Sequence, residues 1–462
     1  MKKILFFLLS SWLALPVSVG LCMVQSAVGQ TAQAPDVQTT SGQVKLHGVL
    51  KRFNNAAELD DHSELESLVL PSAKRMIITD TTGVFTLAFP LEAPDYFRLG
   101  RNILYLSPGD NLEVVIDFED PEGGSFTGRG NAVNMYLRGT LYPKAGSFLD
   151  GGRMLKKRSP AETLDAIQAA AASRKKELDE LKDVSNEFKR LEYARIRADI
   201  IRSFSAVYGY EFYMNRNQDS AKAFIASFEK IAAPVLAEYN KDFLDASLLK
   251  VEVYRDVADD LPGVQGPSSQ AGIIRDWLKA SELVRQMEQT NDKKDLQSFR
   301  VRIDSIGTAS YKNALDHSLA SLLAFGKGDK AVDFVATDKD GKKVPLSSLK
   351  GKVIFVDIWA TWCGPCMEEM PHYEELKAKY KDNPSVAFVS LSIDDDKNMW
   401  QRSMEARKAA GYQWVIDRNH LSAYNIVGVP RTLLINKDFR IVELNGEMPS
   451  DPAAAKSIDG LL

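Results

Sequence analysis

Cysteine and histidine are scarce in this sequence. Its 462 residues include three cysteines and five histidines, and two of the cysteines form one C-x-x-C pattern, Cys363 and Cys366. A structural zinc site takes four ligands, and no second C-x-x-C pattern is present, so a metal site would also need His372 and His420. We therefore expect no metal ion, and we expect the pair to act through its sulfur atoms.

The sequence also lacks a long basic run, a basic domain and a recognisable repeat. It has 58 Lys and Arg residues against 62 Asp and Glu residues, and a formal net charge of −4. Nucleic-acid-binding domains concentrate positive charge on one face, so nucleic acid is not an expected partner. The length predicts two or three domains with ordinary hydrophobic cores, and no solenoid is expected.

Residues 1–29 have the pattern of an export signal. Lys2 and Lys3 precede an apolar run from Ile4 to Leu15, and a small-x-small cleavage pattern ends at Gly29. Cleavage there would remove the third cysteine, so the remaining pair would form the one possible disulfide bond, with a functional task. We therefore expect the body of the chain in the periplasm or cell envelope.

Two alternatives remain open for this N-terminal segment. Uncharged residues continue as far as Val24, which is nearly long enough for an uncleaved membrane anchor. Cys22 would suit a lipoprotein, although Leu21 before it fits that pattern poorly. Both alternatives predict the same export of the rest of the chain.

The most informative stretch begins with a predicted strand, Val353 to Ala360. This run is apolar except at Asp357, as in a strand that is buried on both faces. A turn then leads into a helix that carries Cys363 in its first turn. Unpaired backbone N–H groups and the helix dipole favour an anion there, so we expect a stabilised Cys363 thiolate.

The second cysteine lies about one helical turn further on. Gly364 and Pro365 suit a helix start, and they place Cys366 within bridging distance of Cys363. After Cys363 has formed a mixed disulfide with a client, Cys366 can attack it from within the same molecule. The spacing therefore predicts a pair that cycles between dithiol and disulfide.

The chain carries WCGPC, the active-site signature of thioredoxins, from Trp362 to Cys366. Its flanks, DIWATWCGPCMEEMPHYEEL, resemble the TlpA/ResA-like branch of the thioredoxin-like superfamily, which is related to AhpC/TSA proteins. The resemblance covers residues 327–462, less than a third of the chain. It implies an α/β thioredoxin-like fold and a thiol-disulfide oxidoreductase without a cofactor.

The resemblance also implies roles for residues outside the cysteine pair. Asp357 matches the buried acid that relays a proton to the second cysteine, and its burial should raise its pKa; a structural acid paired with a lysine is the alternative. Glu369 matches a glutamate that the branch keeps by the active site, with a solvated helix carboxylate as the alternative. Pro430 matches the family's cis-proline, beside which the Val429 backbone would pair with a client; an ordinary trans proline is the alternative.

The first part of the chain reads as short strands separated by turn signals, so residues 42–150 are predicted as a β-sandwich-like domain. This part resembles an N-terminal domain of unknown function that precedes TlpA-like modules in envelope proteins. The predicted strands are Gln43–Leu50, Arg75–Thr79, Gly83–Phe89, Tyr96–Leu99, Ile103–Leu106 and Leu112–Asp117.

Residues 153–326 read as a helical domain. Ser159 and Glu162 form a capping box pattern around Pro160, and apolar residues then follow at helical spacing. A further helix is predicted over Phe243 to Val257. Proline should break the helices at Pro234.

The expected reaction is disulfide exchange with protein clients. The TlpA/ResA-like resemblance implies reduction, including that of apocytochrome c thiols, with electrons from a membrane thiol carrier. Gly-Pro between the cysteines is the dipeptide of reducing thioredoxins, yet an oxidase or isomerase would use the same residues at a higher potential. A peroxidase lacks support, because the residues before Cys363 do not match a peroxidatic site, and a non-enzymatic binding protein is the remaining alternative.

Overall fold

The computed structural model describes most of the chain after the predicted export signal. The described residues are 42–53, 56–70, 75–140, 147–150, 152–155, 158–214, 217–394, 397–424, 426 and 428–462. The predicted signal peptide, the alternative membrane anchor and Cys22 lie outside them. No helix among the described residues is both long enough and apolar enough to cross a bilayer.

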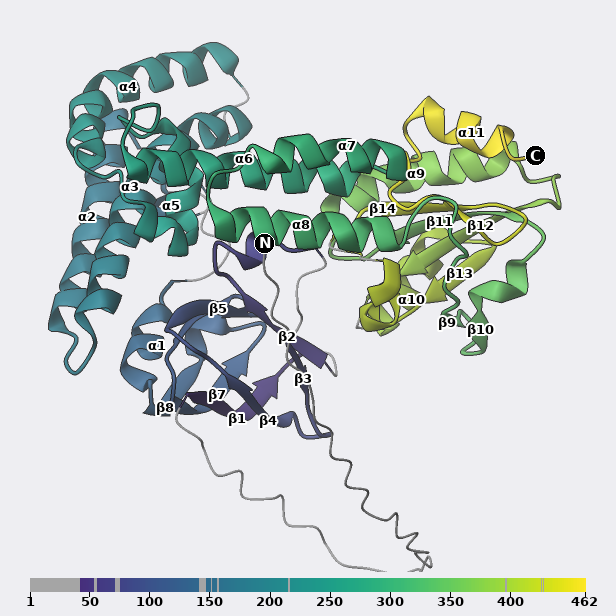
Figure 1. The fold of residues 1–462 in the computed structure, drawn as a ribbon, viewed down its shortest axis with the longest axis horizontal. Coiled ribbons are helices and arrows are strands. Elements are labelled where there is room, and N and C mark those ends of the chain that lie inside the picture. The colour runs from purple at the N-terminus through teal and green to yellow at the C-terminus, as the bar shows by residue number, and fades with distance from the viewer. Residues whose placement is uncertain are drawn as a thin grey trace, which may run out of the picture. The chain divides into compact units, whose positions relative to one another are not determined.

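The N-terminal region contains two open four-stranded sheets (Figure 1), with strand orders β4-β1-β7-β8 and β3-β2-β5-β6. The elements are β1 (Gln43–Lys51), β2 (Ala56–Asp61), β3 (Arg75–Ile78), β4 (Val84–Pro90), β5 (Asp95–Leu99), β6 (Asn102–Leu106), β7 (Asn111–Asp117), β8 (Ser125–Arg129) and α1 (Asn131–Leu137). All six predicted strands are present, and the strand-rich character is confirmed. The β-sandwich remains a prediction.

The sequence patterns did not predict three elements of this region: β2, β8 and α1. Strand β2 reads AAELDD, and Ala and Asp are depleted in strands, so its local signal is weak. Strand β8 contains Gly128 and buries one large side chain, Phe126. These strands form because neighbouring strands offer backbone partners, which short-range sequence patterns do not reveal.

The central region is helical, as predicted. Its helices are α2 (Pro160–Glu180), α3 (Asn186–Met214), α4 (Gln218–Asn240), α5 (Glu252–Val257), α6 (Ser269–Gln289), α7 (Lys293–Asp304) and α8 (Ala309–Ala324). The predicted capping box is present: the Glu162 backbone N–H donates to the Ser159 hydroxyl at 3.3 Å, and the Ser159 N–H donates to the Glu162 carboxylate at 2.8 Å.

Two details of the helical prediction were wrong. Pro234 lies inside α4 and does not end it. A helix can accept one lost hydrogen bond when an apolar face packs along its length, and α4 buries Ala221, Ile225, Phe228 and Ala232. The segment predicted as one helix over Phe243 to Val257 forms a short 3₁₀ helix, Ala246–Lys250, followed by α5.

The C-terminal region is an α/β layer around a seven-stranded mixed sheet with the order β10-β9-β13-β12-β11-β14-β15 (Figure 1). Its elements are β9 (Val335–Asp338), β10 (Lys343–Pro345), β11 (Val353–Trp359), α9 (Gly364–Lys379), β12 (Val386–Ser392), α10 (Lys397–Arg407), β13 (Tyr412–Val415), β14 (Arg431–Ile435), β15 (Ile441–Glu443) and α11 (Pro452–Asp459). The predicted alternation of strands and helices is confirmed.

Strand β11 lies inside the sheet, parallel to β12 and antiparallel to β14, and it is buried along its whole length. Side chains alternate between the two faces of a strand. Val353 and Phe355 pack in one cluster with residues of α9 and α11, whereas Ile354 and Val356, which alternate with them, belong to a different cluster. Asp357 therefore lies on the face of β11 that α9 covers.

Helices α9 and α10 are neighbours. Helix α9 connects β11 to β12, and α10 connects β12 to β13; the three strands are parallel and lie in this order in the sheet. Right-handed crossovers place both helices on the same face of the sheet. In agreement, Lys377 of α9 donates to the Ala410 carbonyl just beyond α10 at 3.1 Å. Arg407 at the end of α10 also contacts Met370 of α9 and Trp359 at the end of β11, so the end of β11, the first half of α9 and the end of α10 meet in one region.

Candidate active site

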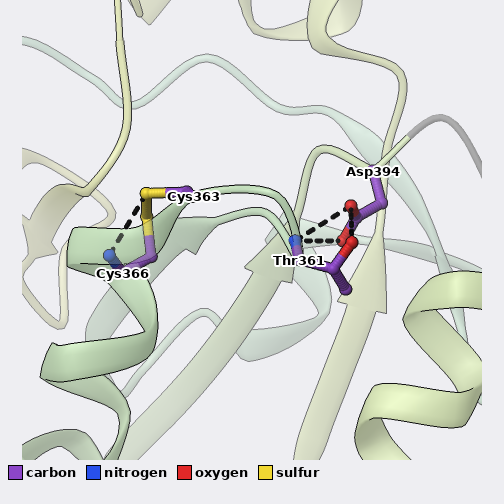
Figure 2. The surroundings of a disulfide bond; sticks show 4 residues. All are labelled: Thr361, Cys363, Cys366 and Asp394. Carbon is purple, nitrogen blue, oxygen red and sulfur yellow. Dashed lines mark hydrogen bonds between the residues drawn. A yellow bond between two sulfur atoms is a disulfide. The ribbon is translucent and has the colours of Figure 1, made fainter. Parts of the chain in front are cut away.

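The two cysteines are joined by a disulfide bond at the start of α9, with their Cα atoms 5.3 Å apart. Cys363 is the N-cap residue, and its Sγ accepts a hydrogen bond from the Cys366 backbone N–H at 3.2 Å. Figure 2 shows this contact across the first turn. The predicted position of Cys363 at the helix start is confirmed, and the structure represents the oxidised form.

The surroundings of the disulfide combine buried sulfur with exposed apolar side chains. Cys363 and Cys366 are 5% and 1% exposed, whereas Trp362 is 67% exposed. Met367, one residue beyond the pair, is also exposed. An apolar surface therefore lies beside a disulfide that presents little of its own area.

The sequence patterns did not predict one important residue of this region, Asp394. Asp394 follows β12, is buried, and accepts hydrogen bonds from the Thr361 N–H at 2.9 and 3.0 Å and from the Thr361 hydroxyl at 2.6 Å (Figure 2). The Ser392 hydroxyl also donates to it at 2.7 Å. Asp394 thus fixes the turn that leads into Cys363. An acid at the carboxyl end of a strand beside β11 is the signal that could have identified it.

We expect Asp394→Ala to destabilise the C-terminal region by about 2–3 kcal/mol, because the buried Ser392 hydroxyl and the partly buried Thr361 hydroxyl and N–H would lose their carboxylate acceptor. Denaturant unfolding followed by tryptophan fluorescence measures this, since four of the six tryptophans lie between residues 359 and 414. Asp382→Ala is the control because Asp382 is exposed. Equal midpoints for the two variants would contradict this role of Asp394.

Asp357 is 2% exposed. Burial, helped by the nearby Glu369 charge, raises the pKa of Asp357 to about 7, and the Arg407 charge acts in the opposite direction. No hydrogen bond or ion pair of its carboxyl group is found among the described residues, and no lysine there pairs with it. The raised pKa agrees with the sequence prediction.

Glu369 lies one turn beyond Cys366 on α9. Its two carboxylate oxygens accept hydrogen bonds from the Ser450 backbone N–H at 2.9 Å and from the Ser450 hydroxyl at 2.7 Å. It therefore differs from a freely solvated carboxylate, because it connects α9 to the segment before α11.

Pro430 directly precedes β14, and the Val429–Pro430 peptide bond is cis. Strand β14 pairs with β11, where Thr432 lies opposite Asp357. The elements thus bring Asp357, Glu369 and the cysteine pair to the same end of α9. Pro430 lies just before the neighbouring strand β14, and Trp362 is exposed to solvent.

The two histidines considered as zinc ligands lie on different elements: His372 on α9 and His420 in the 3₁₀ helix Arg418–Tyr424. His372 faces Glu375 at 3.8 Å on α9. Among the described residues, no group of three or more His, Cys, Asp or Glu side chains could hold a metal ion.

The Redoxin family model matches residues 326–462. Thiol-disulfide oxidoreductase ResA from Halalkalibacterium halodurans is 35% identical over 144 residues, which cover 30% of this chain and 78% of that protein. ResA from Bacillus subtilis is 32% identical over 140 residues, covering 28% and 76%. A crystal structure of the thioredoxin domain of a Bacteroides vulgatus thiol-disulfide oxidoreductase is 24% identical over 29% of this chain and 97% of that chain, with a TM-score of 0.27. Through its C-terminal region the chain belongs to the ResA family of thiol-disulfide oxidoreductases.

Proposed function

We propose that this protein reduces disulfide bonds in protein clients in the periplasm or cell envelope. The observation that carries the proposal is the position of Cys363 at the N-cap of α9, where its Sγ accepts the Cys366 N–H. In the reduced protein, this donor and the helix dipole would stabilise a Cys363 thiolate, the form that attacks a disulfide.

The reaction would proceed in two exchange steps. The Cys363 thiolate attacks one sulfur of the client disulfide, forms a mixed disulfide and releases the other client sulfur as a thiolate. The Cys366 thiolate then attacks Cys363 Sγ, which frees the second client thiol and leaves the Cys363–Cys366 disulfide. Two electrons pass from the pair to the client.

The second step needs a proton acceptor, because Cys366 must lose its proton before it attacks. Asp357 is the proposed acceptor: its pKa of about 7 leaves it able to take a proton near neutral pH. Glu369 is proposed to adjust the electrostatics of Asp357, since its charge raises the Asp357 pKa.

Client binding is proposed at the exposed surface beside the disulfide. Trp362 would supply apolar contact area, and the backbone at Val429 and Pro430 would pair with an extended client segment. Apocytochrome c thiols are one candidate client, and a membrane thiol carrier is the proposed electron donor. The export pattern of residues 1–29 supports this location.

A trapping experiment tests the proposal. In a Cys366→Ser protein, Cys363 can still attack a client, but nothing within the molecule resolves the mixed disulfide, so clients should remain attached. Mass spectrometry of complexes that a reductant releases would identify them. A Cys363→Ser, Cys366→Ser double variant is the control, and equal recovery of proteins from both variants would refute the proposal.

The direction of exchange has a separate test. We expect a reduction potential near the thioredoxin value of about −270 mV, because Gly364 and Pro365 form the dipeptide of reducing thioredoxins. Equilibration with glutathione of known ratio measures this potential. A value above about −150 mV would assign the protein to oxidation or isomerisation instead.

A further inference from the structure

A partly buried arginine at the end of α10 contacts both elements that carry the redox site. The Nη1 of Arg407 donates to the Met370 sulfur of α9 at 2.9 Å, and its Cζ lies 4.6 Å from the centre of the Trp359 ring of β11. Its Nε donates to the Ser403 carbonyl at 3.3 Å. Met370 lies one helical turn beyond Cys366, so the guanidinium group lies between the redox helix and the strand that precedes it.

The same guanidinium group has unused hydrogen-bonding capacity. Its Nη2 is buried without a hydrogen-bond partner among the residues that the structure describes, although buried polar groups are normally paired. Trp359 and Asp357 lie two residues apart on β11 and therefore on the same face of the sheet. Within the described part of the chain, a cation with a free donor and a buried carboxyl group without a partner thus occupy the same side of β11.

Charged groups reach this location from several elements. The charge of Glu369 on α9 favours the protonated form of Asp357, and the charge of Arg407 favours its ionised form. Arg407 interacts electrostatically with Glu374 and Tyr373 of α9, with Asp357, and with Asp394 after β12. Within the described parts of the chain, Arg407 is the cation that acts on Asp357. It opposes both burial and the Glu369 charge.

We propose that Arg407 is a positioning residue for thiol-disulfide exchange, whose guanidinium group, placed between α9 and β11, favours the Asp357 carboxylate over its protonated form so that it can accept the Cys366 proton. This inference rests on the role proposed for Asp357. The Cys366 S–H bond breaks, its proton passes to the Asp357 carboxylate, and the resulting thiolate displaces the client sulfur from Cys363. Asp357 later returns the proton to solvent. Arg407 itself gives up no proton.

The test follows the resolving step as a function of pH. A mixed disulfide is formed on the full-length reduced protein, and release of the client thiol is timed between pH 5 and 9. We expect Arg407→Gln to move the acid limb upward by about one pH unit, which lowers the rate at pH 7 about fivefold as the ionised fraction of Asp357 falls from one half to about one tenth. Arg407→Lys keeps the charge and should remain within about twofold of the native protein. If Arg407→Gln does not fold, Arg407→Met replaces it. The methionine keeps an apolar stem against Trp359 and should shift the acid limb in the same way.

The pH profile separates this role from a structural one, because a loosened site would slow the step equally at every pH. The Asp357→Asn background provides the second readout: there, Arg407→Gln should cause no further shift. An acid limb that stays in place in the neutral variants, or one that shifts equally in the Asp357→Asn background, would overturn the inference. Trapping of clients by Cys366→Ser does not depend on Arg407. The trapping experiment therefore tests the proposed exchange activity separately from the role of Arg407.

Discussion

Cys363→Ser is expected to lower insulin reduction by at least about a thousandfold, equivalent to about 4 kcal/mol of transition-state stabilisation. The N-cap position and the hydrogen bond from the Cys366 N–H act on a sulfur anion. A serine hydroxyl stays protonated near neutral pH, so the same environment cannot supply an effective nucleophile. The assay follows insulin precipitation with dithiothreitol as electron source.

Two further variants make this prediction specific. Cys366→Ser should attack a disulfide once, at close to the native rate, and then stop, because it lacks the resolving sulfur. Cys22→Ser removes the third cysteine and should retain full turnover. Two results would contradict the assignment of Cys363 as nucleophile: turnover of insulin by Cys363→Ser, or an equal loss of the first attack on a disulfide in Cys363→Ser and Cys366→Ser.

The second large effect concerns stability and its dependence on pH. Asp357 has a folded-state pKa of about 7, whereas an unfolded aspartate has a pKa near 3.9. The folded protein therefore binds this proton more tightly, and its stability falls by about 4 kcal/mol as the pH rises from about 4 to about 7. Above pH 7 this contribution is constant, because the group is ionised in both states.

Asp357→Asn removes the ionisation and should remove this pH dependence. The unfolding free energy of the variant relative to the native protein should therefore increase by about 4 kcal/mol between pH 4 and pH 8. Denaturant unfolding of the C-terminal region, followed by tryptophan fluorescence, measures the difference. Asp382→Asn is the control, since its carboxylate is exposed in the folded protein. A difference that does not change with pH would show that Asp357 titrates normally in the folded state.

The same substitution is expected to slow client release, because the amide side chain that it introduces could not accept the Cys366 proton. Stability and activity would then change in opposite directions. Such opposition is expected where a buried charge is kept for chemistry and is unfavourable for folding.

Local patterns predicted the redox pair well. Cys363 at a helix start, the buried strand β11 and the capping box at Ser159 all depend on residues within a few positions of one another, and the structure contains each. The predictions failed where distant packing outweighs local preference. Pro234 continues a helix because one face is buried, and β2 forms because β3 and β5 pair with it.

The sequence alone determined that two cysteines share the first turn of a helix after a buried strand, since helix starts and strand burial follow from short-range spacing. The tertiary structure decided which charges surround that pair. Asp394, Arg407 and Ser450 reach Thr361, Met370 and Glu369 from more than 30 residues away, and such contacts depend on how strands pair and helices pack. The sequence therefore identified the sulfur chemistry, and the packing of β11, α9 and α10 selected the groups that can control its protons.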